Sequence, residues 1–181
     1  MGALLGTAAI LASASSAART DPYVRYLASA NTCPGSQQAG LTPRAAVQAL
    51  TCLVDYARAR RGVPPLRSSA ELNRGAALKL ADDLRCGRLV SHDPCGSGWR
   101  SVYRQAGYLP AHRVWLGENL GYAGGSLATP ATVVDMWLNS PMHRRNLFDP
   151  RFRDGGFAAK NVARGVLYAG AFGTRRVESL G

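Results

Sequence analysis

The sequence predicts a single domain of the α+β class, in which helices surround a small antiparallel sheet. Its 181 residues, 46% hydrophobic and 18% charged, suffice for one core and show no internal repeat. Apolar residues recur at helical spacing in three segments, and strand-like runs occupy three others. Helices are expected at 43–61, 68–86 and 130–139, and strands at 114–123, 156–162 and 166–172.

A lead segment of mixed polarity, residues 19–42, precedes the first helix. The Thr42 hydroxyl can cap this helix, and Pro43 suits its first position. Gly62 is expected just past its end, where glycine is common. The buried stripe of this helix comprises Val47, Leu50, Val54 and Ala57.

The second helix is expected to start at Ser68, since Glu71 three residues later completes a capping box. Gly87 ends the helix. Gly75 inside it costs stability, which indicates that another group packs closely there. The predicted buried stripe comprises Leu72, Ala76, Leu80 and Leu84.

Candidate functional residues follow the second helix. Residues 89–98 form a loop that carries His92, and 99–105 read as a short helix. The strand at 114–123 contains Glu118, whose apolar neighbours make an unpaired carboxylate expensive. Glu118 therefore needs a partner such as a histidine, a metal or backbone donors.

The third helix starts at Thr129-Pro130, and a short fourth helix starts at Ser140-Pro141. His143 falls in the first turn of this fourth helix. The positive end of a helix disfavours a cationic imidazole, so we expect His143 to be neutral near pH 7. The two last strands pair as an antiparallel hairpin, and both Trp115 and Trp137 are expected in the core.

The N-terminus resembles a signal peptide. An apolar run at residues 3–12 is followed by small residues up to Ala18, which predicts a cleaved segment at 1–18 and a secreted protein. No part of the mature chain reaches transmembrane length.

Four cysteines fit an exported chain with two disulfides. Three pairings are possible, and we favour Cys33–Cys52 and Cys86–Cys95. The second bond would close a small loop next to His92. The chain contains no Cys-x-x-Cys motif, which weighs against a thiolate metal site.

The net charge is +11, which raises the question of nucleic acid or an anionic surface. Arginines are scattered along the chain, and no basic run is interleaved with aromatic residues. This distribution argues against nucleic acid as a partner. Binding to anionic envelope polymers or lipids through surface arginines stays open as one possible function.

His92, Glu118 and His143 are the candidate cleft residues. Two histidines and a carboxylate match a zinc ligand set with an open position, although their spacing fits no compact metal motif. The same residues could equally form a buried polar network. Asp93, next to His92, could orient its ring from behind.

Together these segments resemble the CAP superfamily of cysteine-rich secretory, antigen 5 and pathogenesis-related proteins. The similarity is strongest to the bacterial SCP-like branch. It covers about residues 45–173, and its order and spacing make it specific. It rests on 53–62, Ser91-His92, 104–108, Gly117-Glu118-Asn119-Leu120, 137–147 and Phe172-Gly173.

The resemblance implies a three-layer α-β-α sandwich at residues 43–175, with 176–181 as a tail. It also implies a secreted, disulfide-bonded domain whose cleft holds the three candidate residues, with His92 and His143 as ligands for a divalent metal such as zinc. Asn119 and Ser140 are expected to support them. Many family members have a second acid where this chain has Ser140.

The leading functional hypothesis is a secreted, non-catalytic binding module. Its partner would be a small apolar ligand, lipid-like or sterol-like, or an extracellular protein. The rival hypothesis is a metal-dependent, peptidase-like hydrolase with Glu118 as the general base. Members of the resembling family differ widely in activity, so fold does not choose between the two.

Overall fold

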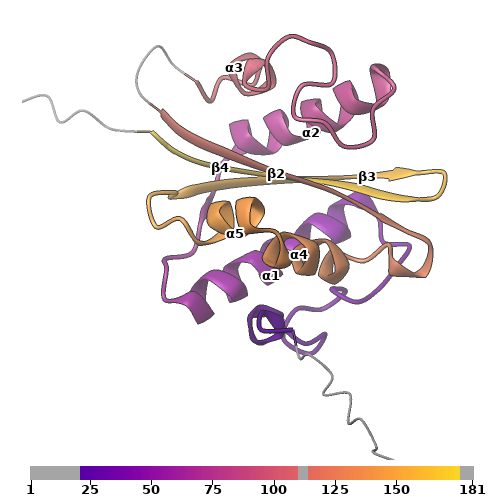
Figure 1. Ribbon diagram of the computed structural model, residues 1–181, viewed down its shortest axis with the longest axis vertical. Helices are drawn as coiled ribbons and strands as arrows, with labels where there is room; N and C mark the ends of the chain where they lie inside the picture. The colour runs from indigo at the N-terminus through magenta and orange to yellow at the C-terminus, as the bar shows by residue number, and fades with distance from the viewer. Residues whose placement is uncertain (1–20, 110–113, 176–181) are drawn as a thin grey trace, which may run out of the picture.

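The computed structural model describes residues 21–109 and 114–175. Figure 1 shows three layers: a sheet in the middle, α2 and α3 on one face, and α1, α4 and α5 on the other. The predicted α-β-α sandwich is therefore confirmed. The predicted signal peptide at 1–18 and the tail at 176–181 lie outside the described residues.

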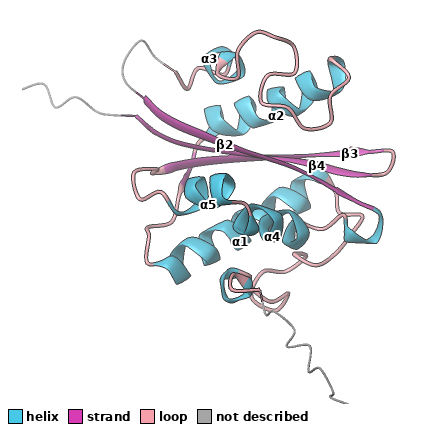
Figure 2. Ribbon diagram, in the orientation of Figure 1, coloured by secondary structure: helices cyan, strands magenta, loops and turns pink. Residues whose placement is uncertain are grey.

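The sheet, seen nearly edge-on between the helices in Figure 2, has the strand order β1-β3-β4-β2. The predicted hairpin is present as β3 and β4, and β2 pairs antiparallel with β4, so Glu118 lies opposite Ala171. A two-residue strand, β1, adds a parallel pair with β3 that the sequence did not predict, because two residues show no periodicity. The strands are β1 (Arg67–Ser68), β2 (Val114–Gly124), β3 (Asp154–Val162) and β4 (Gly165–Arg175).

The layer formed by α1, α4 and α5 contains the largest hydrophobic core, where these helices pack against the sheet. The Thr42 hydroxyl caps α1 by accepting from the Ala45 amide, and Gly62 ends the helix at φ 77°, as predicted. Trp137 of α4 is fully buried and donates to the Leu120 carbonyl of β2. The elements are η1 (Val24–Tyr26), α1 (Pro43–Arg61), η2 (Gly125–Leu127), α4 (Pro130–Asn139) and α5 (Pro141–Phe148).

The upper layer consists of α2 (Ala70–Arg85) and α3 (Ser101–Gln105). The predicted cap of α2 is wrong by one residue: Ser68 belongs to β1, and the hydroxyl of Ser69 accepts from the Leu72 amide. That hydroxyl also donates to the Glu71 carboxylate at 2.8 Å. A serine hydroxyl therefore caps α2 as predicted, but the serine is Ser69, because Ser68 pairs with β3.

Gly75 has the close neighbour that its position in α2 predicts. A Cβ added there would lie 2.3 Å from the Tyr103 ring, so only glycine lets α2 and α3 approach this closely. Leu84, expected in the core, is 38% exposed. The charged side chains of Lys79 and Asp83 occupy the buried face of α2 instead.

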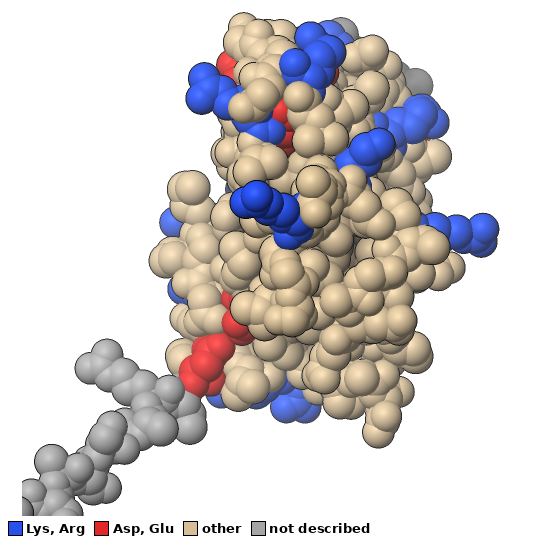
Figure 3. Space-filling view, turned by 90° about the vertical axis from the view of Figure 1, so that its right-hand side faces the viewer, with Lys and Arg blue, Asp and Glu red and all other residues tan. Residues whose placement is uncertain are grey.

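Trp115 is also exposed, at 50%, because it lies near the end of β2 and outside the three core clusters. Basic side chains are spread in separate groups over the face of the molecule in Figure 3, among few acidic ones. This agrees with the scattered arginines of the sequence.

Candidate functional site

Glu118 is the centre of the candidate site. It lies on β2, and its side chain is only 1% exposed. The Nδ1 atom of His92 lies 2.7 Å from one carboxylate oxygen, Oε1. The Tyr103 hydroxyl of α3 donates to the other oxygen, Oε2. Both oxygens of the carboxylate are therefore engaged by the protein.

Lys79 supplies the buried counter-charge to Glu118. Its ammonium lies 3.8 Å from Oε1, and both side chains are 1% exposed. It also donates to the carbonyls of His92 and Trp99, at 3.3 Å in the latter case. One side chain thus neutralises Glu118 and holds the backbone of the loop that carries His92.

The protonation of the surrounding groups follows from burial. The pKa of Tyr103 is raised well above its usual value, by burial and then by the Glu118 charge, so the phenol keeps its proton and donates. Because an ionised carboxylate only accepts, Nδ1 of His92 carries the proton that it shares with Glu118. This leaves Nε2 of His92 on a ring that is 49% exposed.

His143 is the third residue of α5 and is half-buried. Its pKa is lowered, chiefly by burial and then by the charge of His92, so a neutral ring is expected at pH 7. The predicted neutrality agrees with this direction, and burial is its main cause. The two imidazoles therefore interact electrostatically.

A pair of asparagines joins α5 to β2. The Asn119 amide donates to the His143 carbonyl at 3.0 Å. The Asn146 amide donates to the Asn119 side-chain oxygen at 2.9 Å and to the Glu118 carbonyl at 3.1 Å. Asn119 therefore links β2 to the backbone of α5 at His143. Ser140 occupies the N-cap of α5, but its side chain makes no capping hydrogen bond.

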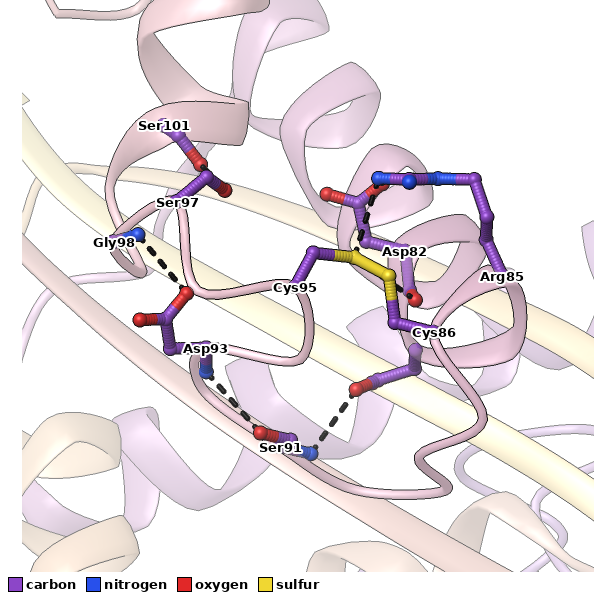
Figure 4. The surroundings of a disulfide bond; sticks show 10 residues. Asp82, Arg85, Cys86, Ser91, Asp93, Cys95, Ser97, Gly98 and Ser101 are labelled. Atoms are coloured by element: carbon purple, nitrogen blue, oxygen red, sulfur yellow. Dashed lines mark hydrogen bonds and ion pairs between the residues drawn. A yellow bond between two sulfur atoms is a disulfide. The ribbon is translucent and has the colours of Figure 1, made fainter.

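The Cys86–Cys95 disulfide closes the His92 loop, and Cys33–Cys52 links the lead segment to α1, so both predicted pairings are confirmed. Figure 4 shows that the Asp93 carboxylate accepts from the Gly98 amide, at 2.9 Å. The expectation that Asp93 orients His92 is corrected: Glu118 bonds to the ring, and Asp93 shapes the loop.

Asp83 is a buried acid one helical turn beyond Lys79. One of its oxygens accepts from the Ser91 amide at 3.1 Å, whereas Oδ2 is buried with no hydrogen-bond partner. Burial is the main reason that its pKa is raised to about 6. Lys79, Asp83 and Tyr103 were not predicted from the sequence as site residues. Positions 79 and 83 do fall on the same helical face as Leu72 and were a readable signal.

A metal ion needs several donor side chains around one point. Within 21–109 and 114–175, no group of three or more His, Cys, Asp or Glu side chains is arranged to hold an ion. The donor set that remains is the two imidazoles, with Glu118 behind His92. That carboxylate–histidine pair is the usual outer support of a metal-binding histidine. Ser140 stands where the resembling family often has a second acid.

Fold and site together define a small α-β-α sandwich with a histidine and glutamate centre beside its sheet. Residues 52–171 match the CAP family, described as the cysteine-rich secretory protein family. The chain belongs to this family. Among curated proteins, no sequence matches it significantly.

Solved bacterial structures share the fold. An extracellular SCP-domain protein of Bacillus anthracis is 22% identical over 75% of this chain and 44% of its own, with a TM-score of 0.58. A cysteine-rich secretory protein of Staphylococcus aureus is 18% identical over 75% and 41%, with a TM-score of 0.56. An outer surface protein of Borrelia burgdorferi is 19% identical over 70% and 90%, with a TM-score of 0.60.

This chain spans less than half the length of the first two of these proteins. In the described part of the chain, no helix has the length and hydropathy needed to cross a bilayer.

Proposed function

We propose that this chain is a secreted, non-catalytic binding module. The occupied carboxylate of Glu118 carries this proposal. A general base needs a free oxygen within reach of the proton that it removes. Oε1 accepts from His92 beside the Lys79 ammonium, and Oε2 accepts from Tyr103. An acid that is bound in this way and only 1% exposed holds a loop in place and offers little access to a water.

The His92 loop offers a surface to a partner. Leu89 and Val90, directly before Ser91-His92, are 55% and 48% exposed. The disulfide from Cys86 to Cys95 and the bonds from Lys79 keep this loop ordered, so the exposed apolar pair loses little entropy on binding. A small apolar ligand or an extracellular protein is the partner that such a surface fits.

We also propose that His92 and His143 hold a divalent metal such as zinc, weakly. Neutral imidazoles are the donors that zinc prefers, and the lowered pKa of His143 keeps its ring available. When bound, the metal would supply a positive charge that anchors an acidic group of a partner. With only two protein donors, its affinity should be well below that of a structural zinc site.

Two measurements test this proposal. Native mass spectrometry of the protein purified from its culture medium should show bound lipid or a bound protein. Leu89→Ser with Val90→Ser should lose that species, whereas Leu127→Ser, a control at a residue 65% exposed, should retain it. Retention in both variants would contradict the proposed surface.

Calorimetry with zinc chloride tests the metal. His92→Ala with His143→Ala should abolish zinc uptake, and equal uptake by this double variant would refute the metal site. Hydrolytic turnover that stops on both chelation and Glu118→Gln would establish the rival hydrolase.

A further inference from the structure

A concave site that neither His92 nor His143 lines contains a cluster of arginines. It is a groove of about 530 Å³ between the end of α1, the outer side of α5 and the loop that leads to β3. Four arginines line it above the ring of Phe148. We call it the arginine groove, defined by Arg61, Arg144, Arg145 and Arg151.

The groove has little acid of its own. Asp149, its one acidic lining residue, is bound by Arg151, whose guanidinium donates at 2.9, 3.1 and 2.5 Å. These bonds are the main reason that the pKa of Asp149 is lowered, so it stays ionised and already paired. A single carboxylate thus faces four guanidinium groups.

A fifth positive charge lies beneath the groove. Arg58 is fully buried, and its guanidinium donates to the carbonyls of Pro64, Leu147 and Phe152, at 2.8, 2.6 and 3.2 Å. Carbonyls hold a guanidinium in place without cancelling its charge. Besides Asp149, the carboxylate close enough to act on it is Asp55.

Helix ends offset part of this charge. Both α1 and α5 end at the groove, and each C-terminus carries about half a negative charge. Arginines at helix ends often serve only this purpose. Here five arginines face two carboxylates and two helix ends, which leaves an excess of about two positive charges.

Three of the groove arginines are held by stacking. Arg144 lies 4.1 Å from the centre of the Tyr23 ring and also donates to the Leu138 carbonyl. Arg151 lies 4.0 Å from the centre of the Trp115 ring, and Arg61 lies 5.8 Å from that of Phe148. Stacked guanidiniums lose less freedom when an anion binds.

We propose that the arginine groove binds a soluble polyanion that carries several phosphate groups along a chain. The guanidiniums come from three different elements, so an anion with acceptors in several directions fits them better than a planar carboxylate. The excess charge calls for more than one anionic group. A chain can lie in this open groove with several of its anionic groups against the arginines.

Calorimetry with tripolyphosphate at about 0.1 M salt tests the site, since the Debye length is then about 10 Å. Arg61→Gln with Arg145→Gln removes two exposed groove charges. Arg44→Gln with Arg164→Gln is the matched control, because it removes the same charge at exposed positions outside the groove. Circular dichroism establishes that both variants are folded.

The groove variant should bind tripolyphosphate about 10-fold more weakly or worse, and the control should bind within about 2-fold of the parent. Equal weakening in both variants would overturn the proposal, because it would show that the anion is attracted by the net charge of the whole surface and not by the groove. If monophosphate bound as tightly as tripolyphosphate, the ligand would not need several phosphate groups along a chain. If polyglutamate bound as tightly, the groove would not prefer phosphate to carboxylate. Either result would overturn the proposal. Binding only to phosphatidylglycerol vesicles would assign the groove to membranes and refute the proposal.

Discussion

Replacing Glu118 by glutamine tests the buried ion pair at the centre of the fold. Glutamine keeps the shape of the side chain and an acceptor for Tyr103, but it removes the charge that faces Lys79. The Lys79 ammonium, 1% exposed, would then keep only the carbonyls of His92 and Trp99, with Asp83 as its nearby acid.

The magnitude follows from this burial. Breaking a buried ion pair by removing one partner costs about 3–5 kcal/mol, because the other charge stays buried and uncompensated. Asp83 offsets part of that loss, so we expect Glu118→Gln to lower the free energy of unfolding by about 3 kcal/mol. Lys79→Met should have a similar cost, since it leaves Glu118 without its cation.

A double-mutant cycle in urea measures the coupling. The variant with both Glu118→Gln and Lys79→Met removes both charges of the pair and leaves only Asp83 without its cation, so its loss should be smaller than the sum of the single losses by about 2 kcal/mol. Strict additivity, or a single variant as stable as the parent, would show that the pair does not hold the sheet to the His92 loop.

Three further predictions concern the layer that contains α2, α3 and the His92 loop. Gly75→Ala should lower the free energy of unfolding by about 1–3 kcal/mol through its clash with Tyr103; a gain of about 1 kcal/mol, typical of helix propensity, would contradict the contact. Because the pKa of Asp83 is raised to about 6, the folded state binds more protons, and Asp83 should make stability fall as pH rises from about 4 to about 6, by at most about 3 kcal/mol. Urea titrations at several pH values should show that Asp83→Asn removes this contribution, and an unchanged pH dependence in that variant would contradict it. Cys86→Ser with Cys95→Ser should cost about 2.5 kcal/mol in thermal or urea unfolding and increase hydrogen exchange in the His92 loop; unchanged exchange would show that Lys79 alone orders it.

The local elements and the cysteine pairs were readable from the sequence. Thr42, Pro43 and Gly62 bounded α1 as predicted, because caps and helix stops depend on residues within a few positions of one another. The order of the segments around His92, Glu118 and His143 identified the family in the same way. The two strand-like runs at 156–162 and 166–172, with a short connection between them, predicted the final hairpin.

Only the tertiary structure decided what Glu118 does. Its partners Lys79 and Tyr103 come from α2 and α3, and the absence of a side chain at Gly75 is what lets these helices meet. Likewise, the tryptophan expected in the core became the stacking surface for Arg151. Hydrophobic periodicity tells which face of an element is buried, but a buried charge is determined by whichever distant group neutralises it, and only the folded chain brings that group close.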